Sequence, residues 1–565
     1  MLKAKGFGQR MIKWLSILLQ SASTRIMVNG LHGRSITHAQ GLRQGDPVSL
    51  LLFVIAMDAL TAVVTKASVD GVLSSFGGIS AVQRISIYAD DVAFFIRPSL
   101  QDMQFVREAL LVFGEASGLK VNYSKSMATI FRGEQEDKDR VTSLLHCALA
   151  DFPIRYLGLQ LATRQLTRNE WQPLLDMVKK MAPGWQRGFI QRAGRLVLVK
   201  SVLSARPVHQ LLILNAPDWV FEEINTWMCS FLWAGKDKAN GGQCLVAWNT
   251  ICRPASFGGL GVKNLKLQAL ALRVRWEWLS GVDKDRPWSN LALMVDDDAR
   301  EVFDSLVGIK VGRGDRVLFW HDRWIHGYGA QDIAPSILAM VQTRVINSRT
   351  VEQALVGERW EQDIIGDMPF MAQMQLMHLR HAIATIWRDA EVEDKFSWPC
   401  SGEEGSYSAK ATYARLCQGL IRAPAATCIW RSLAPLKLRI FMWLASQHRI
   451  WTSDRRARHG LQDQPSPCFT CLQSEDNAEH ILAQCVYAQE VWFTCIDELQ
   501  LPISGPTVDD TMVEWWIQKR RSVHSSERRV LTALSSARLG RSESNATHES
   551  STGGSNKCKL ETLFA

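Results

Sequence analysis

The sequence lacks the features of a secreted or membrane-spanning chain. Its 12 cysteines are spread over 565 residues, and most of them show no paired spacing. In a chain of this length, such cysteines are typical of reduced thiols inside the cell and not of a disulfide framework. The longest strongly apolar run without a charge, residues 47–57, ends at Asp58 and is far shorter than the roughly 18–20 residues that span a bilayer. We therefore expect an intracellular protein that does not enter a membrane.

The composition excludes several small or fibrous classes of protein. Charged residues make up 21% and hydrophobic residues 47%, and Lys+Arg 65 against Asp+Glu 56 gives a net charge of +9. These values are typical of a globular chain and exclude a peptide hormone, a collagen, a coiled coil and a small disulfide scaffold. Tryptophan is unusually frequent, with 21 copies against 7 tyrosines, and so many indoles need large cores or stacking surfaces. The length predicts roughly three or four domains.

Two adjacent carboxylates form the sharpest chemical signal in the chain. Asp90 and Asp91 stand between two apolar, β-rich runs, residues 84–88 and 92–96, which predicts a β-hairpin with both acids at its tip. Carboxylates side by side repel one another unless a cation or a base offsets their charge. A hard divalent ion such as Mg²⁺ does so, and it prefers carboxylate oxygens together with substrate phosphates. Taken alone, the pair is also compatible with a solvated Asp-Asp turn.

A glycine-containing loop precedes an apolar helix earlier in the chain. Within residues 41–53, Gln44 and Gly45 lie just before Pro47, which suits the first turn of a helix predicted over 49–66. Glycine permits a close approach of the backbone to a ligand, Gln44 can hydrogen-bond a base or a sugar, and a helix start favours phosphate. The alternative is the ordinary start of a helix.

Cys468, Cys471, His480 and Cys485 form the second strong constellation. A Cys-x2-Cys pair supplies a two-thiolate knuckle, and a histidine with a third thiolate completes a tetrahedral zinc site without an open position, which predicts a structural role for Zn²⁺. His480 and Cys485 are five residues apart and cannot share one face of a straight helix, so we expect a helix break between them. The alternative is a buried thiol pair beside an unrelated histidine. The small core of this region is expected to contain Ile481, Leu482, Val491 and Trp492.

Basic side chains flank this cysteine cluster. Residues 437–459 contain six Lys and Arg side chains and one acid, Asp454, with tryptophans interleaved. Basic groups neutralise phosphate and indoles stack on bases, whereas the alternative is a helical core stripe with a solvated basic face. A second basic run, residues 519–521 with Arg528 and Arg529, is compatible with a solvated helix or a nuclear address. The expected nucleic-acid contacts are Arg449, Arg455, Arg456 and Arg458.

Four ordered segments resemble the palm of reverse transcriptases, most closely those of plant-type non-LTR (LINE-type) retrotransposons. Residues 41–53 resemble the template-and-nucleotide loop of that family, and residues 88–91, Tyr-Ala-Asp-Asp, resemble its catalytic hairpin. Residues 117–126 resemble the segment that follows, and residues 156–159 resemble a hairpin that grips the primer. Further downstream, segments 193–201 and 312–324 are also similar to parts of these elements.

The resemblance implies an RNA-directed DNA polymerase that acts by two-metal nucleotidyl transfer. It implies that Asp90 and Asp91 are catalytic and bind Mg²⁺, that Gln44 and Gly45 contact the template or the nucleotide, and that Lys125 lies near the incoming triphosphate. The implied partners are an RNA template, a DNA primer or target, and a deoxynucleoside triphosphate. The family also carries a zinc-binding region after the polymerase, which supports Zn²⁺ at the cysteine cluster. We expect such a protein to act in the nucleus.

The expected fold is an α+β multidomain chain made of six segments. The first is a partial reverse transcriptase palm, an acidic hairpin plus helices. The predicted boundaries are 1–135 for this palm, 136–235 for a helical thumb-like region, 236–395 for a Trp/Gly-rich connector, 396–500 for a reverse transcriptase-associated zinc-binding domain, 501–531 for a basic helical segment and 532–565 for a disordered tail.

The chain also departs from the family pattern. Polymerases of this kind take a third carboxylate from an upstream palm strand, and this sequence begins at Met1, after the corresponding point. Leu50 replaces the proline that is usual at that position of the loop motif. We therefore expect this chain as written not to polymerise DNA. The alternative function is a non-catalytic RNA- or DNA-binding remnant that keeps a structural zinc module.

Overall fold

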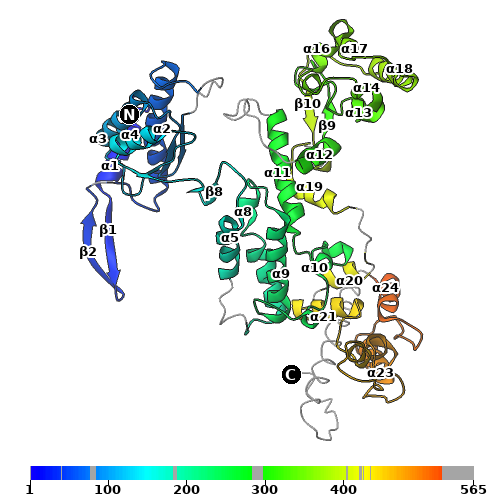
Figure 1. The fold of residues 1–565 in the computed structure, drawn as a ribbon. Helices are drawn as coiled ribbons and strands as arrows, with labels where there is room; N and C mark the ends of the chain where they lie inside the picture. The colour runs from blue at the N-terminus through cyan, green and yellow to red at the C-terminus, as the bar shows by residue number, and fades with distance from the viewer. Residues whose placement is uncertain are drawn as a thin grey trace. The chain divides into compact units, whose positions relative to one another are not determined.

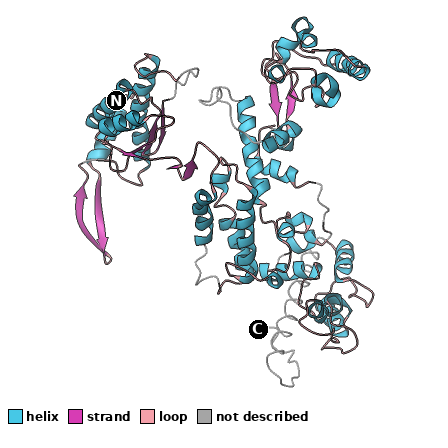
Figure 2. Cartoon of the chain, in the orientation of Figure 1, coloured by secondary structure: helices cyan, strands magenta, loops and turns pink. Residues whose placement is uncertain are grey.

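The described part of the chain is built mainly from helices (Figure 2), which account for 51% of it. The computed structural model describes residues 2–39, 41–76, 84–181, 188–282, 297–401, 405–418, 423, 425–432 and 434–524, and the strands of this part pair only two by two. The predicted disordered tail and the basic pair Arg528 and Arg529 lie outside the described residues. Two compact units are found, one over Met1–Glu170 and one that begins at Trp171 (Figure 1).

The first unit mixes helices with short antiparallel hairpins. The helix predicted over 49–66 is confirmed and begins at Pro47, because the Asp46 carboxylate accepts a hydrogen bond from Val48 N at 3.0 Å and caps it. The two predicted β-rich runs are confirmed as one antiparallel pair. The elements are α1 (Gln9–Gln20), β1 (Ser23–Val28), β2 (Leu31–Thr37), α2 (Pro47–Val69), β3 (Ile85–Tyr88), β4 (Asp91–Phe94), α3 (Leu100–Ser117), β5 (Met127–Ala128), α4 (Gln135–Leu145), β6 (Ala148–Leu149), β7 (Ile154–Tyr156) and β8 (Leu159–Leu161).

Helix α2 is the most apolar helix of this unit and is only partly covered. It buries Met57, Leu60 and Val64 against the β3–β4 hairpin and α3. Among the described residues it is the single helix long and apolar enough to cross a bilayer, and 17% of its most apolar stretch is buried. Length and composition of one helix are weak evidence for a span, since core helices of soluble proteins also meet them. The expectation that the chain avoids membranes therefore stays a prediction.

Asp102 is a buried carboxylate that ties together three parts of the first unit. It is fully buried at the start of α3 and accepts hydrogen bonds from Ser74 N at 3.0 Å, Ser74 Oγ at 2.7 Å, Ser99 Oγ at 2.9 Å and Arg97 N at 3.2 Å. Burial alone would raise the pKa of Asp102, but these hydrogen bonds outweigh it and hold the pKa below its usual value. The ionised carboxylate thus holds residues 74 and 97–99 in place beside α3.

We expect the stability of this unit to fall in acid because of Asp102. Its pKa is lower in the folded state, so its contribution is complete above the unfolded pKa of about 3.9 and is lost as the pH falls through the folded value. Hydrogen exchange of peptides from α3, corrected for intrinsic rates, should show protection that declines below about pH 4. Asp102→Asn should lower protection at neutral pH and remove most of this decline. An unchanged acid profile in the variant would contradict the assignment.

The second unit begins with a helical body. Of the region 136–235 that the sequence predicts to be helical, residues 148–161 instead contain the short strands β6, β7 and β8 of the first unit, and the other described residues are mainly helical. Residues 409–446 pack onto the helical body of the second unit. Asn264 N donates to Tyr413 Oη at 3.0 Å, and Trp443 Nε1 donates to the carbonyl of Gly258 at 2.7 Å. The elements are α5 (Arg168–Lys180), α7 (Arg192–Leu198), η1 (Val199–Leu203), α8 (Val208–Leu211), α9 (Asp218–Ala234), η2 (Gly241–Gln243), α10 (Trp248–Ile251), η3 (Ala255–Phe257), α11 (Leu265–Val282), α12 (Asp297–Leu306), α19 (Ala409–Leu416), α20 (Ala426–Trp430) and α21 (Leu436–Ser446).

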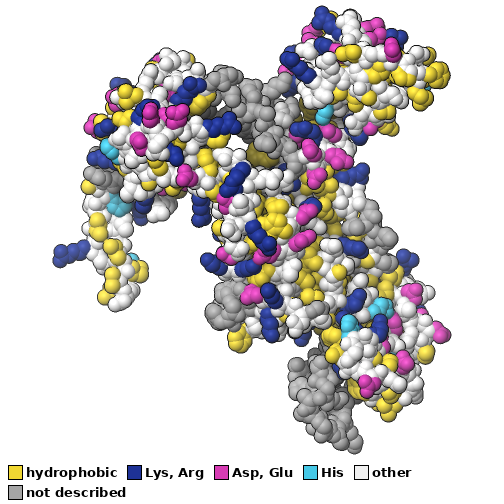
Figure 3. All heavy atoms as spheres, viewed as in Figure 1, with side chains coloured by type: hydrophobic (Ala, Val, Ile, Leu, Met, Phe, Trp, Pro, Cys, Tyr) yellow, Lys and Arg dark blue, Asp and Glu magenta, His cyan; other side chains and the backbone are white. Residues whose placement is uncertain are grey.

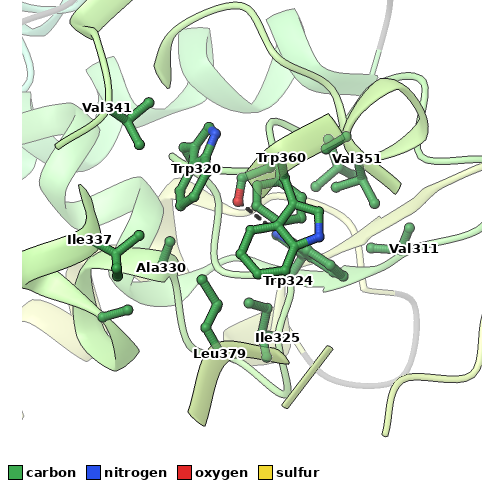
Figure 4. Packing of buried hydrophobic residues seen from close by; sticks show 14 of the residues in the cluster. Val311, Trp320, Trp324, Ile325, Ala330, Ile337, Val341, Val351, Trp360 and Leu379 are labelled. Carbon is green, nitrogen blue, oxygen red and sulfur yellow. Dashed lines mark hydrogen bonds between the residues drawn. The ribbon is translucent and has the colours of Figure 1, made fainter. Parts of the chain in front are cut away.

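A tryptophan-centred core follows α12. Phe319, Trp320, Trp324 and Trp360 pack together there (Figure 4), and all four are almost completely buried. The excess of tryptophan is therefore used here in a core and not in a stacking surface. The surrounding elements are β9 (Gly308–Lys310), α13 (Ala330–Ile333), α14 (Pro335–Leu338), α15 (Thr343–Ile346), α16 (Val351–Leu355), η4 (Val356–Glu358), α17 (Arg359–Gln362), α18 (Phe370–Ala384), β10 (Lys395–Ser397) and η5 (Pro399–Ser401).

Two buried carboxylates connect separate segments of this core by hydrogen bonds. Asp363 accepts a hydrogen bond from Trp320 Nε1 at 3.1 Å and two from Arg349, at 3.0 and 2.6 Å. Asp394 accepts three backbone N–H groups, from Gly312 at 2.7 Å, Gly314 at 2.8 Å and Arg316 at 3.0 Å. The segment 312–324, singled out by its sequence, is thus a structural motif whose loop closes around Asp394.

Candidate metal sites and nucleic-acid surface

The predicted acidic hairpin is present, and both carboxylates lie at its tip. Tyr88 of β3 pairs with Asp91 of β4, and Ala89 adopts a left-handed φ of 51° in the turn between them. Asp90 and Asp91 are exposed, while Ile85 is buried in the core shared with α2. The apolar strands therefore fix the position of two acids that point to solvent, as a metal-binding pair requires.

The glycine loop leads into the same core. Gln44 and Gly45 are exposed just before α2, and Gly45 has a φ of +88°, a conformation that favours glycine. Phe53 of α2 packs in the same cluster as Val92 of β4. The loop and the acidic hairpin are thus mounted on one packed core, although they are about 40 residues apart in sequence.

Lys125 and Leu50 are both accessible. Lys125 lies in a turn with its side chain exposed, and Leu50 is 65% exposed on the first turns of α2. In the part of the chain that the structure describes, no hydrogen bond or ion pair joins Gln44, Lys125, Asp90 and Asp91 to one another. Their roles toward nucleotide and template stay predictions.

Within the part of the chain that the structure describes, no third acid joins Asp90 and Asp91 in a metal-binding group. Among the described residues, the one group of three or more His, Cys, Asp or Glu side chains placed to hold a metal ion is the cysteine cluster. Asp90 and Asp91 therefore supply hard oxygen ligands that suit a divalent ion, but these residues do not complete a polymerase site by themselves.

The structure brings all four predicted zinc ligands together. The Sγ atoms of Cys468, Cys471 and Cys485 and the ring nitrogen of His480 lie within 4.8 Å of one another, with Cys471 Sγ 3.2 Å from His480 Nε2. Zinc–sulfur and zinc–nitrogen bonds of about 2.3 and 2.0 Å fit a cluster of this size. Three sulfurs and one imidazole form a closed tetrahedral set, so the donors fit a structural Zn²⁺.

A single wide helical turn presents His480 and Cys485 to the same ion. Residues 480–484 form the π-helical turn η6 (His480–Gln484), in which Cys485 N donates to the carbonyl of His480 at 2.7 Å. Cys485 itself is extended, with φ −65° and ψ 137°, and α23 (Val486–Glu498) begins after it. The predicted helix break is confirmed, because a regular turn of 3.6 residues cannot align positions five apart.

The first ligand pair lies in a tight knuckle. Cys468 N donates to Ser474 O at 2.7 Å, Leu472 N to Cys468 O at 2.8 Å, and Gln473 N to Cys471 Sγ at 3.5 Å. The Gln473 N–H group, with smaller help from His480, lowers the pKa of Cys471 to about 6. Burial instead raises the pKa of the Cys485 thiol.

Sequence reasoning missed one polar residue at this site. Thr470 Oγ1 lies 2.9 Å from Cys468 Sγ and 3.3 Å from Cys485 Sγ. The position of Thr470 between Cys468 and Cys471 could have indicated this role, because a hydroxyl donor there stabilises the charge of a thiolate.

The core around the zinc ligands differs from the predicted one. Leu482 and Trp492 are buried as expected, but Val491 is 41% exposed. Trp515, from the helix α24 (Met512–Ser522), replaces it and packs 4.8 Å from Trp492, ring centre to ring centre. Met512 N also donates to the Glu479 carboxylate at 2.7 Å. Helix α24 is thus part of the zinc module, across the predicted boundary at residue 500.

The basic segment before the knuckle is only partly available for nucleic acid. Helix α22 (Ser453–Arg458) carries three of the predicted contacts. Arg455 is 4% exposed, donates to the carbonyl of Arg449 and lies over the Trp451 ring. The prediction that Arg455 contacts nucleic acid is therefore wrong, and its role is structural. Arg458 pairs with Asp454. Arg449 and Arg456 remain exposed. Figure 3 shows basic and acidic side chains interspersed over the surface in view.

Comparison with known proteins gives two regional matches. Residues 3–161 match the family described as reverse transcriptase (RNA-dependent DNA polymerase), and residues 407–492 match the family described as zinc-binding in reverse transcriptase. These ranges contain the acidic hairpin and all four ligands of the cysteine cluster.

Three curated proteins are similar to this chain over part of their length. A protein of Arabidopsis thaliana named as a ribonuclease H protein is 24% identical over 367 residues, 59% of this chain and 57% of the relative. A 149 kDa protein of transposon TX1 from Xenopus laevis is 23% identical over 282 residues, 48% of this chain and 20% of the relative. A retrovirus-related Pol polyprotein of a type-2 retrotransposable element from Drosophila melanogaster is 22% identical over 286 residues, 48% of this chain and 25% of the relative.

The fold, the paired acids and the cysteine cluster define a reverse transcriptase domain followed by its zinc-binding region. With a transposon protein and a retrotransposable-element polyprotein among its relatives, the chain is similar to the reverse transcriptases of non-LTR retrotransposons. The chain spans 57% or less of the length of each of these three relatives.

Proposed function

We propose that the chain is the RNA-directed DNA polymerase portion of a LINE-type element. The observation that carries this proposal is the exposed pair Asp90 and Asp91, held at the tip of a hairpin on the core that also supports Gln44 and Gly45. Two Mg²⁺ ions bound there would neutralise charge on the attacking and leaving oxygens of nucleotidyl transfer. Asp90 and Asp91 would bind the ions, and Lys125 would face the incoming triphosphate.

No third acid groups with Asp90 and Asp91 among the described residues, and we expect this chain not to extend a primer. The test is extension of an oligo(dT) primer on poly(rA) with Mg²⁺, compared with the Asp90→Ala/Asp91→Ala variant. Both proteins should give only background product, because two carboxylates do not complete a two-metal site. Extension that disappears in the double variant would contradict this expectation and show that Asp90 and Asp91 support polymerisation.

A second candidate function is non-catalytic binding of RNA or DNA. The observation that favours it is the pair of exposed arginines, Arg449 and Arg456, beside a closed zinc module. RNA binding in the same preparations that fail to extend a primer, with an affinity that falls steeply with salt, would support it.

The zinc module is proposed to be structural, and the chain to act in the nucleus. Four protein ligands leave no coordination position for a substrate. The nuclear address would be the basic run at the end of α24, where Lys519 Nζ donates to Ser504 Oγ at 2.7 Å and Arg521 is exposed.

A further inference from the structure

Two cysteines outside the zinc module are brought together by the fold. Cys229 lies in α9, and Cys244 follows the short helix η2, 15 residues later. Their Sγ atoms are 3.7 Å apart in hydrogen-bonding geometry, and both side chains are partly exposed. Other cysteines of the second unit, among them Cys252, Cys417 and Cys428, are buried.

The segment between the two cysteines is folded back onto α9 by its own hydrogen bonds. Trp227 Nε1 donates to the Asp237 carboxylate at 2.9 Å, and Ala239 N donates to Ser230 Oγ at 3.2 Å. These contacts lie on both sides of Cys229 along the helix. They place Cys244 beside Cys229 independently of any bond between the sulfurs.

We propose that Cys229 and Cys244 are a thiol modification site that forms a reversible disulfide when the protein meets a peroxide. The sulfurs need to approach by less than 2 Å to reach the bonded distance of about 2.05 Å, a change that side-chain rotation beside a loop can supply. The site is separate from the proposed polymerase and zinc functions and does not depend on them.

The reaction begins at Cys244. Burial and the neighbouring Cys244 raise the pKa of Cys229, which makes Cys229 the poorer first nucleophile. The Cys244 thiolate attacks one peroxide oxygen, the O–O bond breaks, and the departing hydroxide takes a proton to become water. The sulfur of Cys229 then attacks the resulting sulfenic acid, the S–O bond breaks, and a second water leaves with the Cys229 proton. Peroxide is reduced to two waters, and two thiols are oxidised to one disulfide.

The test is peptide mapping of the full-length, zinc-loaded protein. After removal of reductant and treatment with a slight excess of hydrogen peroxide, mass spectrometry under non-reducing conditions should show the Cys229 and Cys244 peptides joined in a majority of chains. Dithiothreitol should restore both thiols. Hydrogen exchange of residues 230–243 should slow on oxidation, because the new bond closes the loop.

Matched cysteine variants separate this site from general oxidation. Cys244→Ser and Cys229→Ala should each abolish the cross-link and the slowed exchange, whereas Cys147→Ser, at a buried cysteine in the other unit, should leave both unchanged. Metal analysis should give one zinc per chain before and after mild oxidation. The proposal is overturned if both thiols stay free, if Cys229 pairs with Cys252 instead, or if a second zinc ion occupies the pair.

Discussion

Replacing Cys468 with serine is expected to remove zinc from the protein and to unfold the module from the knuckle to α24. Cys468 is 1% exposed and supplies one of four ligand atoms within 4.8 Å of one another. Structural zinc binding is worth about 10–16 kcal/mol in zinc-finger peptides at neutral pH, and that free energy supports folding directly. Metal analysis should fall from about one zinc per chain to nearly none, and peptides from α23 and α24 should lose hydrogen-exchange protection.

The matched control is Cys495→Ser. Cys495 is equally buried, at 1% exposure, and lies in α23 of the same module, but it is not among the four ligands. The control should keep its zinc and most of its protection. Zinc retained in full by Cys468→Ser, or absent from the parent protein purified without chelator, would remove the basis for the site.

The second large effect is expected from Asp394→Ala. The buried Asp394 carboxylate accepts the backbone N–H groups of Gly312, Gly314 and Arg316. Its loss leaves two buried donors and one partly buried donor without this partner, at about 1–3 kcal/mol for each buried one. We expect the tryptophan-centred core to lose about 3–5 kcal/mol of local stability, since such costs do not add fully. Hydrogen exchange of peptides covering 311–325 measures this loss.

The neighbouring acid provides the comparison for Asp394. Glu393 is 62% exposed and lies 3.6 Å from Arg316 in a surface ion pair, so Glu393→Ala should cost less than about 1 kcal/mol. Asp394→Asn should lose an amount of local stability between those of Asp394→Ala and Glu393→Ala, because an amide oxygen keeps part of the acceptor capacity of the carboxylate. Equal protection in Asp394→Ala and Glu393→Ala would show that the loop does not depend on the carboxylate.

Local patterns in the sequence predicted the parts of this protein whose chemistry depends on spacing. The apolar, β-rich runs on both sides of Asp90 and Asp91 predicted the hairpin, and it is confirmed in the structure. The ligand spacing predicted the cysteine cluster, and the five-residue separation of His480 and Cys485 predicted the break that appears as a π-helical turn. These features depend on residues that are close together in the sequence and on the general geometry of the backbone, so the spacing of the residues is enough to predict them.

The same local patterns did not fully predict which side chains are buried. A run of arginines gave no sign that Arg455 would be buried against Trp451 while Arg449 and Arg456 stayed exposed. Val491 was predicted to be in the zinc core but is exposed, whereas Trp515 is buried there against Trp492. Trp515 belongs to α24, which lies beyond the predicted boundary of the zinc-binding domain. Which face of a helix is covered depends on a distant element, and periodicity alone does not identify that element.

The sequence by itself determined the resemblance to reverse transcriptases, the acidic hairpin and the cysteine cluster, because each depends on residues close together along the chain. Only the tertiary structure decided that Asp394 closes the loop at 312–316, and that Cys229 and Cys244 face one another. Asp394 and Gly312 are 82 residues apart, and the two cysteines share no recognisable motif. Such contacts follow from how whole elements pack, and packing is a property of the complete fold.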